Sequence, residues 1–188
     1  MNAEYHESLD LPVEAYAFNN IVVDEAGNKW FSYYGDHGTS FIKHNQNKWE
    51  LIIEDNSDNI SLNSYIVRKD TIWGLDYRDN IYSYHNEKWH KIDLGFSRYE
   101  LIDIKYDKTR DLICLLSRDA VYTYDGTNLH DYSDYFDNPE YHELSNLEID
   151  SEGNYWMRAY PDHLVKYDGD SVVTDIKAPN LAYYTQFV

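Results

Sequence analysis

A set of four short hydrophobic segments recurs four times along the chain, with a period of about 42 residues. Each segment is about five to seven residues long, and polar turn residues such as Gly27-Asn28 and Asp125-Gly126 separate the segments. The second segments align on Trp30, Trp73, Cys114 and Trp156, at steps of 43, 41 and 42 residues. No stretch has apolar residues spaced by three and four over ten or more positions, as an amphipathic helix would. The pattern predicts four antiparallel strands per repeat, which is the signature of a β-propeller blade.

The predicted fold is therefore all-β, a small β-propeller of four four-stranded repeats that could include an incomplete closing blade. The repeats span about 18–63, 64–100, 101–143 and 144–180. One blade cannot bury its own hydrophobic face, so the blades must pack against one another. With 188 residues, 43% of them hydrophobic, the chain is long enough for one domain over 1–188 and too short for two comfortable ones.

The two ends of the chain bear on how the ring closes. "YHESLDLP", with a strand at 5–11, resembles the last strand of a repeat, whereas "LAYYTQFV" at 181–188 stands where a first strand should begin. Pairing of terminal strands removes exposed sheet edges in propellers. Three arrangements stay open: a four-bladed ring with the terminal strands added, which we favour, a five-bladed ring with a reduced closing blade, or an open arc completed by another chain. A homo-oligomer is thus one expectation.

The first turn of the repeat carries a motif that occurs twice, as "DEAGNKW" at 24–30 and "DSEGNYW" at 150–156. With its aliphatic strand before it and a short strand ending in Tyr-Asp-Gly or Tyr-His-Asn after it, the motif resembles the two-component-regulator propeller repeat. The likeness covers about residues 18–176, although the second unit shortens the turn and the third has Cys114 in place of Trp. That family is best known from ligand-binding sensor regions of bacterial hybrid histidine kinases, usually with more repeats. The resemblance implies a propeller with a recognition role and no catalytic residue.

The same motif could instead be an oxygen-rich metal loop, but its acids do not keep their register after the first one. Calcium loops need several oxygen ligands in alternation. Gly27-Asn28 and Gly153-Asn154 do keep their register, and both residue types tolerate positive φ in tight turns. Two Asp-His pairs, Asp36-His37 and Asp162-His163, fall in turns of different blades and are not expected to converge on one ion. We therefore predict no metal and no cofactor.

Catalysis receives little support from the sequence. Cys114 stands in the apolar segment "DLICLLS" and is predicted to be a buried packing residue rather than a reactive thiolate. The chain contains no G-x-S-x-G, phosphate-binding loop or H-E-x-x-H motif. We expect a protein that is not an enzyme. A site where His37, His163 and acids converge would reverse that expectation.

Charge limits the choice of partner. There are 16 basic and 34 acidic residues, which gives a formal net charge of −18. Such a surface repels nucleic acid and anionic lipid and attracts basic proteins. The amino end is acidic and the longest apolar run is "LICLL", so we expect no membrane segment and a cytoplasmic location. The single cysteine excludes an intramolecular disulfide.

The segment that departs most from the repeat is "HDYSDYFDNPEYHEL", residues 130–144. It combines acids with aromatic residues and contains no Lys or Arg. Acids steer a basic partner, and aromatic rings make contacts at low entropic cost. An ordinary connection with its rings tucked under the next blade is the competing interpretation. The predicted partner-binding residues are Asp131, Tyr132, Asp134, Tyr135, Phe136, Asp137, Glu140, Tyr141 and Glu143.

A second candidate surface consists of tyrosines in the short strands, about half of which should lie between blades while the remainder could stack on a glycan. They are Tyr33, Tyr34, Tyr77, Tyr82, Tyr84, Tyr122, Tyr124, Tyr160 and Tyr167. Two functional hypotheses follow. The first is a non-catalytic, acidic inhibitor or immunity-type protein that blocks a basic toxin or nuclease. The second is a ligand-binding, sensor-type propeller, with a glycan as one candidate ligand, that lacks its signalling domain.

Overall fold

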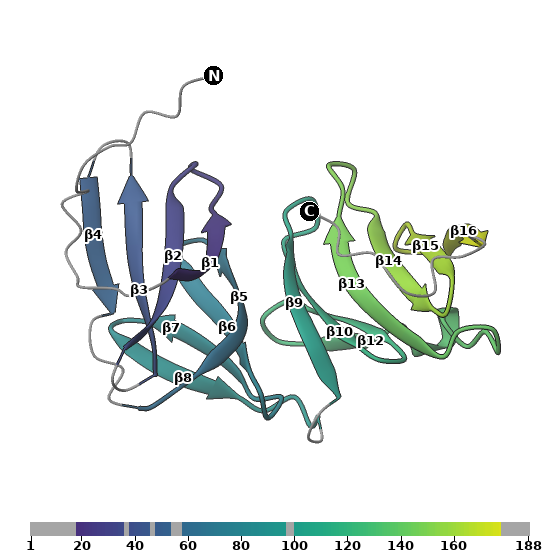
Figure 1. Cartoon of the computed structure of the whole chain (residues 1–188), viewed down its shortest axis with the longest axis horizontal. Coiled ribbons are helices and arrows are strands. Elements are labelled where there is room, and N and C mark those ends of the chain that lie inside the picture. Colours follow the sequence, from purple (N-terminus) through teal and green to yellow (C-terminus); the bar gives the residue numbers. More distant parts are fainter. Residues whose placement is uncertain (1–17, 36–37, 46–47, 54–57, 97–99, 178–188) are drawn as a thin grey trace.

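The computed structural model describes residues 18–35, 38–45, 48–53, 58–96 and 100–177. Sixteen strands form four separate sheets, and each sheet is a four-stranded antiparallel meander in chain order (Figure 1). This confirms the predicted all-β propeller of four four-stranded repeats. The predicted terminal strands at 5–11 and 181–188 lie outside the described residues, so the closure of the ring stays a prediction.

The bounds of the strands follow the repeat. Blade 1 contains β1 (Phe18–Val23), β2 (Lys29–Gly35), β3 (Gly38–Asn45) and β4 (Lys48–Ile53). Blade 2 contains β5 (Leu62–Arg68), β6 (Thr71–Asp76), β7 (Ile81–His85) and β8 (Lys88–Ile92). Blade 3 contains β9 (Leu101–Asp107), β10 (Leu112–Ser117), β11 (Val121–Tyr124) and β12 (Leu129–Asp131). Blade 4 contains β13 (Glu143–Ile149), β14 (Tyr155–Tyr160), β15 (His163–Tyr167) and β16 (Val172–Lys177).

Hydrophobic residues of the two middle sheets point alternately toward the blades on either side. In β10, Leu115 belongs to the core cluster shared with blade 2, whereas Cys114 and Leu116 belong to the cluster shared with blade 4. A third cluster, which includes Trp30, Phe41 and Tyr65, joins blades 1 and 2. Because β10 is covered on both faces, it is a continuous apolar run rather than an alternating one. The burial of Cys114, with 0% of its surface exposed, confirms its predicted packing role.

The four blades form an arc, with blade 1 and blade 4 at its two ends (Figure 1). The turns β1–β2 and β13–β14 lie along the upper edge in that view, and the connection from β12 to β13 lies along the lower edge. The molecule therefore has two different loop surfaces. We call the surface formed by the first and third turns of each blade the hairpin face. The opposite surface, formed by the second turns and the connections between blades, is the connection face. Within the described ranges, no helix is long and apolar enough to cross a bilayer.

The motif repeated at 24–30 and 150–156 is a turn closed by its own side chains. The Asp24 carboxylate accepts hydrogen bonds from the Trp30 indole Nε1, at 2.8 Å, and from the backbone N and side-chain Nδ2 of Asn28, both at 2.8 Å. Asp150 accepts the equivalent bonds from Asn154 and Trp156, at 2.8–3.0 Å. Gly27 has φ +81° in this turn. The acid is retained because it holds Asn and Trp together, which is an architectural role.

Candidate functional site

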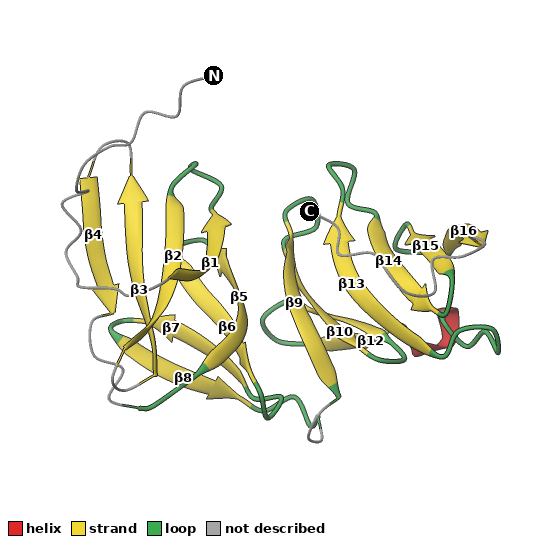
Figure 2. Ribbon diagram, in the orientation of Figure 1, coloured by secondary structure: helices red, strands yellow, loops and turns green. Residues whose placement is uncertain are grey.

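The segment 130–144 connects blade 3 to blade 4 on the connection face. It contains the only helical turn in the described part of the chain, a 3₁₀ turn η1 at Ser133–Tyr135, drawn red in Figure 2. The segment follows the end of β12 and returns to the core at Leu144, whose backbone N donates to the carbonyl oxygen of Arg118. It is thus fixed at both ends to blade 3.

Most aromatic rings of this segment pack inward. Phe136 is 4% exposed and belongs to the core between blades 3 and 4. The rings of Tyr132, Tyr135 and Phe136 all lie within 5.6 Å of the Tyr167 ring, centroid to centroid. Tyr135 nevertheless leaves 45% of its surface in solvent. The structure thus brings three of the predicted rings together around Tyr167, and Tyr135 is the one with a large exposed area.

The predicted acids fall into two groups. Glu140 bonds to Lys177 at 3.1 Å, Glu143 bonds to Arg118 at 2.7 Å, and Asp131 accepts the backbone N of Ser133 at 2.8 Å. Asp134 and Asp137 are exposed and have no ion-pair partner among the described residues. Carboxylates without an internal partner are the ones that remain free to meet a partner's charge. Partner binding by all nine residues stays a prediction.

A buried histidine fixes the second half of the segment. His163, 4% exposed, has its Nδ1 2.6 Å from Asp175 Oδ1 and its Nε2 3.3 Å from Glu140 Oε2. Tyr141 packs edge-on against the His163 ring and donates its hydroxyl to Asp175 Oδ2 at 2.9 Å. Burial and the Asp175 carboxylate raise the pKa of Tyr141 to about 12. These contacts tie Glu140 and Tyr141 to blade 4.

The residues that the sequence analysis considered for metal binding or nucleophilic catalysis do not form a site in the described part of the structure. Asp36-His37 lies outside the described residues, and no group of His, Cys, Asp or Glu side chains in the described ranges is suited to hold a metal ion. Burial raises the pKa of the Cys114 thiol to about 12, so the thiolate is scarce at neutral pH. His163 was predicted to lie in the second turn of its blade, but it begins strand β15, where Asp175 contacts its Nδ1 at 2.6 Å.

A second polar site, which the sequence analysis missed, lies along the innermost strands. All four of these strands have an irregular register near their first half, between Phe18 and Asn20, Leu62 and Ser64, Leu101 and Asp103, and Ser145 and Glu148. A β-bulge re-aims the side chains that follow it and is frequent beside functional sites. The residues after the first three bulges are Asn20, Ser64 and Asp103. The polar residues Asn20, Ser64 and Asp103 within the first hydrophobic segments of the repeats were the signal that could have revealed this site.

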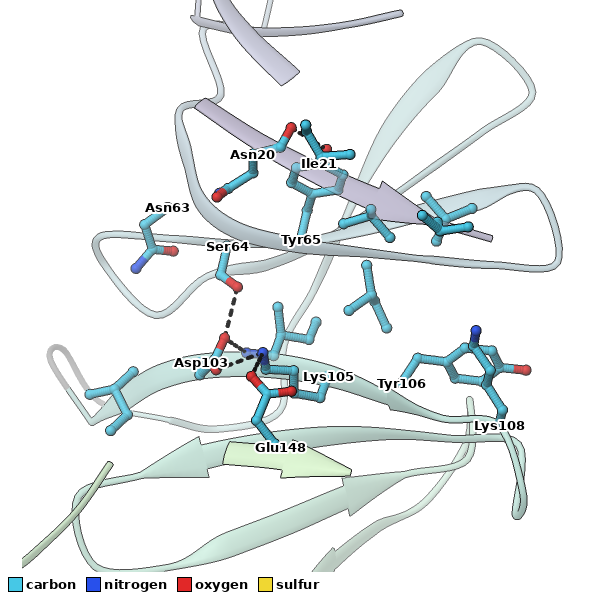
Figure 3. Close-up of a pocket in the computed structure, with 16 residues that line it drawn as sticks. Asn20, Ile21, Asn63, Ser64, Tyr65, Asp103, Lys105, Tyr106, Lys108 and Glu148 are labelled. Atoms are coloured by element: carbon cyan, nitrogen blue, oxygen red, sulfur yellow. Dashed lines mark hydrogen bonds and ion pairs between the residues drawn. The ribbon is translucent and has the colours of Figure 1, made fainter. Parts of the chain in front are cut away.

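These strands line a cavity of about 560 Å³, which we call the axial cavity (Figure 3). Ser64 donates its hydroxyl to Asp103 Oδ1 at 2.8 Å, and Lys105 Nζ lies 2.9 Å from Glu148 Oε1 and 3.6 Å from Asp103 Oδ2. The network joins blades 2, 3 and 4 (Figure 3). The side-chain oxygen of Asn63 is enclosed and has no hydrogen-bond partner in the protein. A buried acceptor without a partner is costly unless a ligand or water supplies a donor.

The protonation states of Asp103 and Lys105 in the axial cavity depend on each other and on Glu148. Burial raises the pKa of Asp103, because desolvation disfavours its charged form. Burial opposes the charge of Lys105 as well, but the carboxylates of Asp103 and Glu148 outweigh it and raise the Lys105 pKa. The ammonium therefore stays charged between two carboxylates, and the cavity presents acceptors to a polar ligand.

Comparison with solved structures shows the same fold in proteins of different activities. A streptogramin B lyase is 13% identical, with a TM-score of 0.66 over 92% of this chain and 58% of the lyase. The extracellular domain of the putative one component system BT4673 from B. thetaiotaomicron is 12% identical, with a TM-score of 0.62 over 95% of this chain and 24% of that protein. YCF48 bound to D1 peptide is 12% identical, with a TM-score of 0.59 over 91% of this chain and 57% of YCF48.

These similarities establish the propeller fold. The chain spans less than two thirds of the length of each of these structures. No protein-family model and no curated protein sequence matches the chain. The fold is shared by an enzyme, by an extracellular domain of a one component system and by a protein that binds a peptide. Function must accordingly be argued from the sites themselves.

Proposed function

We propose that the chain is a non-catalytic recognition module that binds a basic protein through segment 130–144. The observation that carries this proposal is the pair of unpaired, exposed carboxylates, Asp134 and Asp137, on either side of the half-exposed Tyr135. The segment around them is fixed by the Tyr167 ring cluster and by His163, so binding requires little additional ordering. The net charge of −18 adds long-range attraction for a cationic partner.

An inhibitor or immunity-type role follows from this chemistry. A basic toxin or nuclease has a cationic active-site surface that an acidic protein can cover. In this role the exposed acids accelerate association and the aromatic rings slow dissociation. The protein acts in the cytoplasm of the cell that it protects. That YCF48 binds a peptide supports the capacity of such a fold to recognise protein chains.

The experiment is a binding measurement on a purified partner. The partner is isolated by affinity capture from the source cells and then titrated calorimetrically with the protein and with the variant Asp134→Asn/Asp137→Asn. Removing two charges at the contact should weaken binding roughly tenfold and flatten its salt dependence. Asp170→Asn, an exposed acid on the hairpin face, is the matched control and should bind like the wild type. Partner binding that is insensitive to salt and to the double substitution would contradict the proposal.

A second function rests on the axial cavity: a ligand-binding propeller of the sensor type, without its signalling domain. The enclosed Asn63 oxygen and the carboxylates of Asp103 and Glu148 accept hydrogen bonds from a ligand rich in hydroxyl groups, such as a saccharide. Calorimetric titration with a panel of mono- and oligosaccharides tests this function. Binding should be lost in Asn63→Ala and Asp103→Asn and retained in Asp134→Asn/Asp137→Asn. The two functions thus respond to different substitutions.

A further inference from the structure

All of the strongly exposed tyrosines in the described residues lie on the connection face. Their exposed fractions are 53% for Tyr34, 59% for Tyr77, 45% for Tyr135 and 43% for Tyr160. Tyr34, Tyr77 and Tyr160 each follow the aligned tryptophan of their repeat by four residues, at the end of the second strand. In an antiparallel meander, that end points to the same side as the connection to the next blade, which carries Tyr135. The repeat itself therefore places these rings on one surface.

These rings extend well beyond segment 130–144. Tyr34 and Tyr77 belong to blades 1 and 2, and their hydroxyl oxygens are 3.5 Å apart. Beside them lies a hollow of about 480 Å³ between the connection before β5 and the β6–β7 turn, walled by Tyr77, by the acids Asp58 and Asp76, and by the exposed Arg78. A smaller hollow of about 380 Å³ is lined by Asp134, Phe136 and Asp137 at the other end of the face. Large exposed rings next to two hollows are typical of a protein-binding surface.

The charge on this face is one-sided. Arg78 and Arg118 are the only Lys or Arg residues that the structure describes in the connections and second turns. Arg118 is paired with Glu143, and Lys177 at the end of β16 is paired with Glu140. The acids described in the same loops are Asp58, Asp79, Asp93, Glu100, Asp119, Asp134, Asp137, Glu140 and Asp162. Asp58 is exposed, like Asp134 and Asp137. A partner that covers both hollows must therefore supply positive charge.

One of the tyrosines already contacts a cation. The Arg158 guanidinium carbon lies 5.7 Å from the centre of the Tyr160 ring. A guanidinium over an aromatic face is attracted by the ring quadrupole, and this contact gains strength where water is displaced. Tyr34 and Tyr77 hold the same position in their repeats without an arginine two residues earlier, since Ser32 and Leu75 occupy that place. More than half of the surface of each of these two tyrosines is exposed, so they can meet cations supplied by a partner.

We infer that the connection face, from Tyr34 and Tyr77 to segment 130–144, binds an arginine-rich segment of the partner, with its guanidinium groups stacked on Tyr34 and Tyr77 beside Asp58. This inference rests on the proposed function, because segment 130–144 forms one end of the same surface. It adds the chemistry of the partner and a second contact region on blades 1 and 2.

The test uses a fluorescently labelled polyarginine peptide and the whole protein, with binding followed by anisotropy at physiological ionic strength. Tyr34→Ala/Tyr77→Ala should weaken binding roughly tenfold, the loss expected for two exposed cation–π contacts. Tyr34→Phe/Tyr77→Phe keeps both rings and should bind within about twofold of the wild type. A polylysine peptide of equal length should bind more weakly, because lysine cannot stack. Tyrosine ring signals in NMR spectra should shift on addition of polyarginine.

Two controls separate a site from general charge attraction. Asp170→Asn removes an exposed acid from the hairpin face, and Asp58→Asn removes one beside Tyr77. Only Asp58→Asn should weaken polyarginine binding. Equal loss in both variants, or wild-type affinity in Tyr34→Ala/Tyr77→Ala, overturns the inference. If the natural partner's binding still depends on Asp134 and Asp137 in that case, the proposed function survives its failure. If binding of the natural partner does not depend on Asp134 and Asp137, the proposed function fails. The inference still stands in that case if Tyr34→Ala/Tyr77→Ala weakens polyarginine binding.

Discussion

The hairpin face and the connection face of the propeller are built from similar turn residues, but the side chains on the two faces have different partners. On the hairpin face, each junction between neighbouring blades is crossed by a basic side chain. Lys43 of blade 1 bonds to Asp70 of blade 2 at 3.2 Å, and Arg68 of blade 2 bonds to Asp111 of blade 3 at 2.7 Å. Arg110 of blade 3 reaches the carbonyl oxygens of Gly153 and Asp168 in blade 4, both at 2.5 Å.

On the connection face, the backbone makes much of the contact between neighbouring loops. Thr39 N donates to the Ile60 carbonyl oxygen at 2.9 Å, Leu144 N donates to that of Arg118 at 2.5 Å, and His142 N donates to that of Tyr160 at 2.9 Å. Bonds of this kind do not depend on which side chains the loops carry. The side chains of Tyr34, Tyr77, Asp134 and Asp137 can therefore face solvent.

Under the proposed function, stability and recognition depend mainly on different faces of this fold. Charged side chains on the hairpin face cross the junctions between blades, while the connection face combines backbone bonds with side-chain contacts within segment 130–144, such as Glu143 with Arg118 and Tyr141 with Asp175. Loops on such a scaffold can change their side chains for binding at little cost in folding free energy.

The largest effect is expected for Asp107, which is fully enclosed on the hairpin face. Its carboxylate accepts bonds from Thr109, from Arg110 at 2.8 Å and from the Tyr155 hydroxyl at 2.9 Å. Asp107→Ala leaves a buried hydroxyl and a guanidinium without their partner and should lower the free energy of unfolding by about 3–5 kcal/mol. Urea denaturation measures this loss. Asp134→Ala on the connection face is the control, with an expected change below about 0.5 kcal/mol. Similar losses for both variants would refute the separation.

Substitution of two glycines with positive φ, one on each face, tests how much the backbone contacts of each face contribute to stability. A Cβ at Gly38, φ +110°, would lie 2.5 Å from the Ile60 carbonyl oxygen, whereas a Cβ at Gly27, φ +81°, would meet no atom within 4 Å. Gly27→Ala therefore costs only backbone strain, about 1 kcal/mol. Gly38→Ala adds a steric clash with a backbone atom and should cost about 2–3 kcal/mol, with loss of the Thr39–Ile60 bond. Thermal denaturation of both variants gives the comparison, and equal costs would show that the backbone contact is unimportant.

Acid should weaken the hairpin face. Burial opposes ionisation of Asp107, but the bonds from Thr109, Arg110 and Tyr155 outweigh it and hold the Asp107 pKa below its usual value. Bonds from Arg68 and Lys69 lower the pKa of Asp111 as well. A carboxyl group with a lowered pKa in the folded state stabilises the protein above its unfolded pKa, near 4, and this contribution is lost as the pH falls below that value.

The measurement is urea denaturation at several pH values between neutrality and acid. The free energy of unfolding of the wild type should fall steeply below about pH 4. Asp107→Ala should show a shallower fall, since the group responsible for part of the slope is gone. A slope unchanged by the substitution would mean that Asp107 contributes no proton linkage.

The sequence predicted the repeat and its strands because both follow from hydrophobic periodicity and turn residues, which are local. Trp30 and Cys114 are buried between blades as the alignment of the repeats implied. The interactions across the junctions could not be predicted in the same way, because Arg68 and Arg110 meet partners about 43 to 58 residues away. The separation of 43 residues, about one repeat, was nevertheless a signal that these side chains could reach the next blade.

The bulges that line the axial cavity depend on strand register, which no local pattern fixes. For segment 130–144, composition indicated acids and rings but not that Phe136 points into the core.

The smallest effect on stability is expected where the effect on binding should be largest. Tyr34 and Tyr77 are 53% and 59% exposed, and their hydroxyl oxygens are 3.5 Å apart. Tyr34→Ala/Tyr77→Ala should therefore change the free energy of unfolding by less than about 1 kcal/mol, far less than Asp107→Ala. Each ring already lies mostly in water, so its removal exposes little new apolar surface. Urea denaturation and far-UV circular dichroism of the double variant provide the check. A loss of several kcal/mol would mean that these rings hold blades 1 and 2 together, and the connection face would then share the stabilising role of the hairpin face.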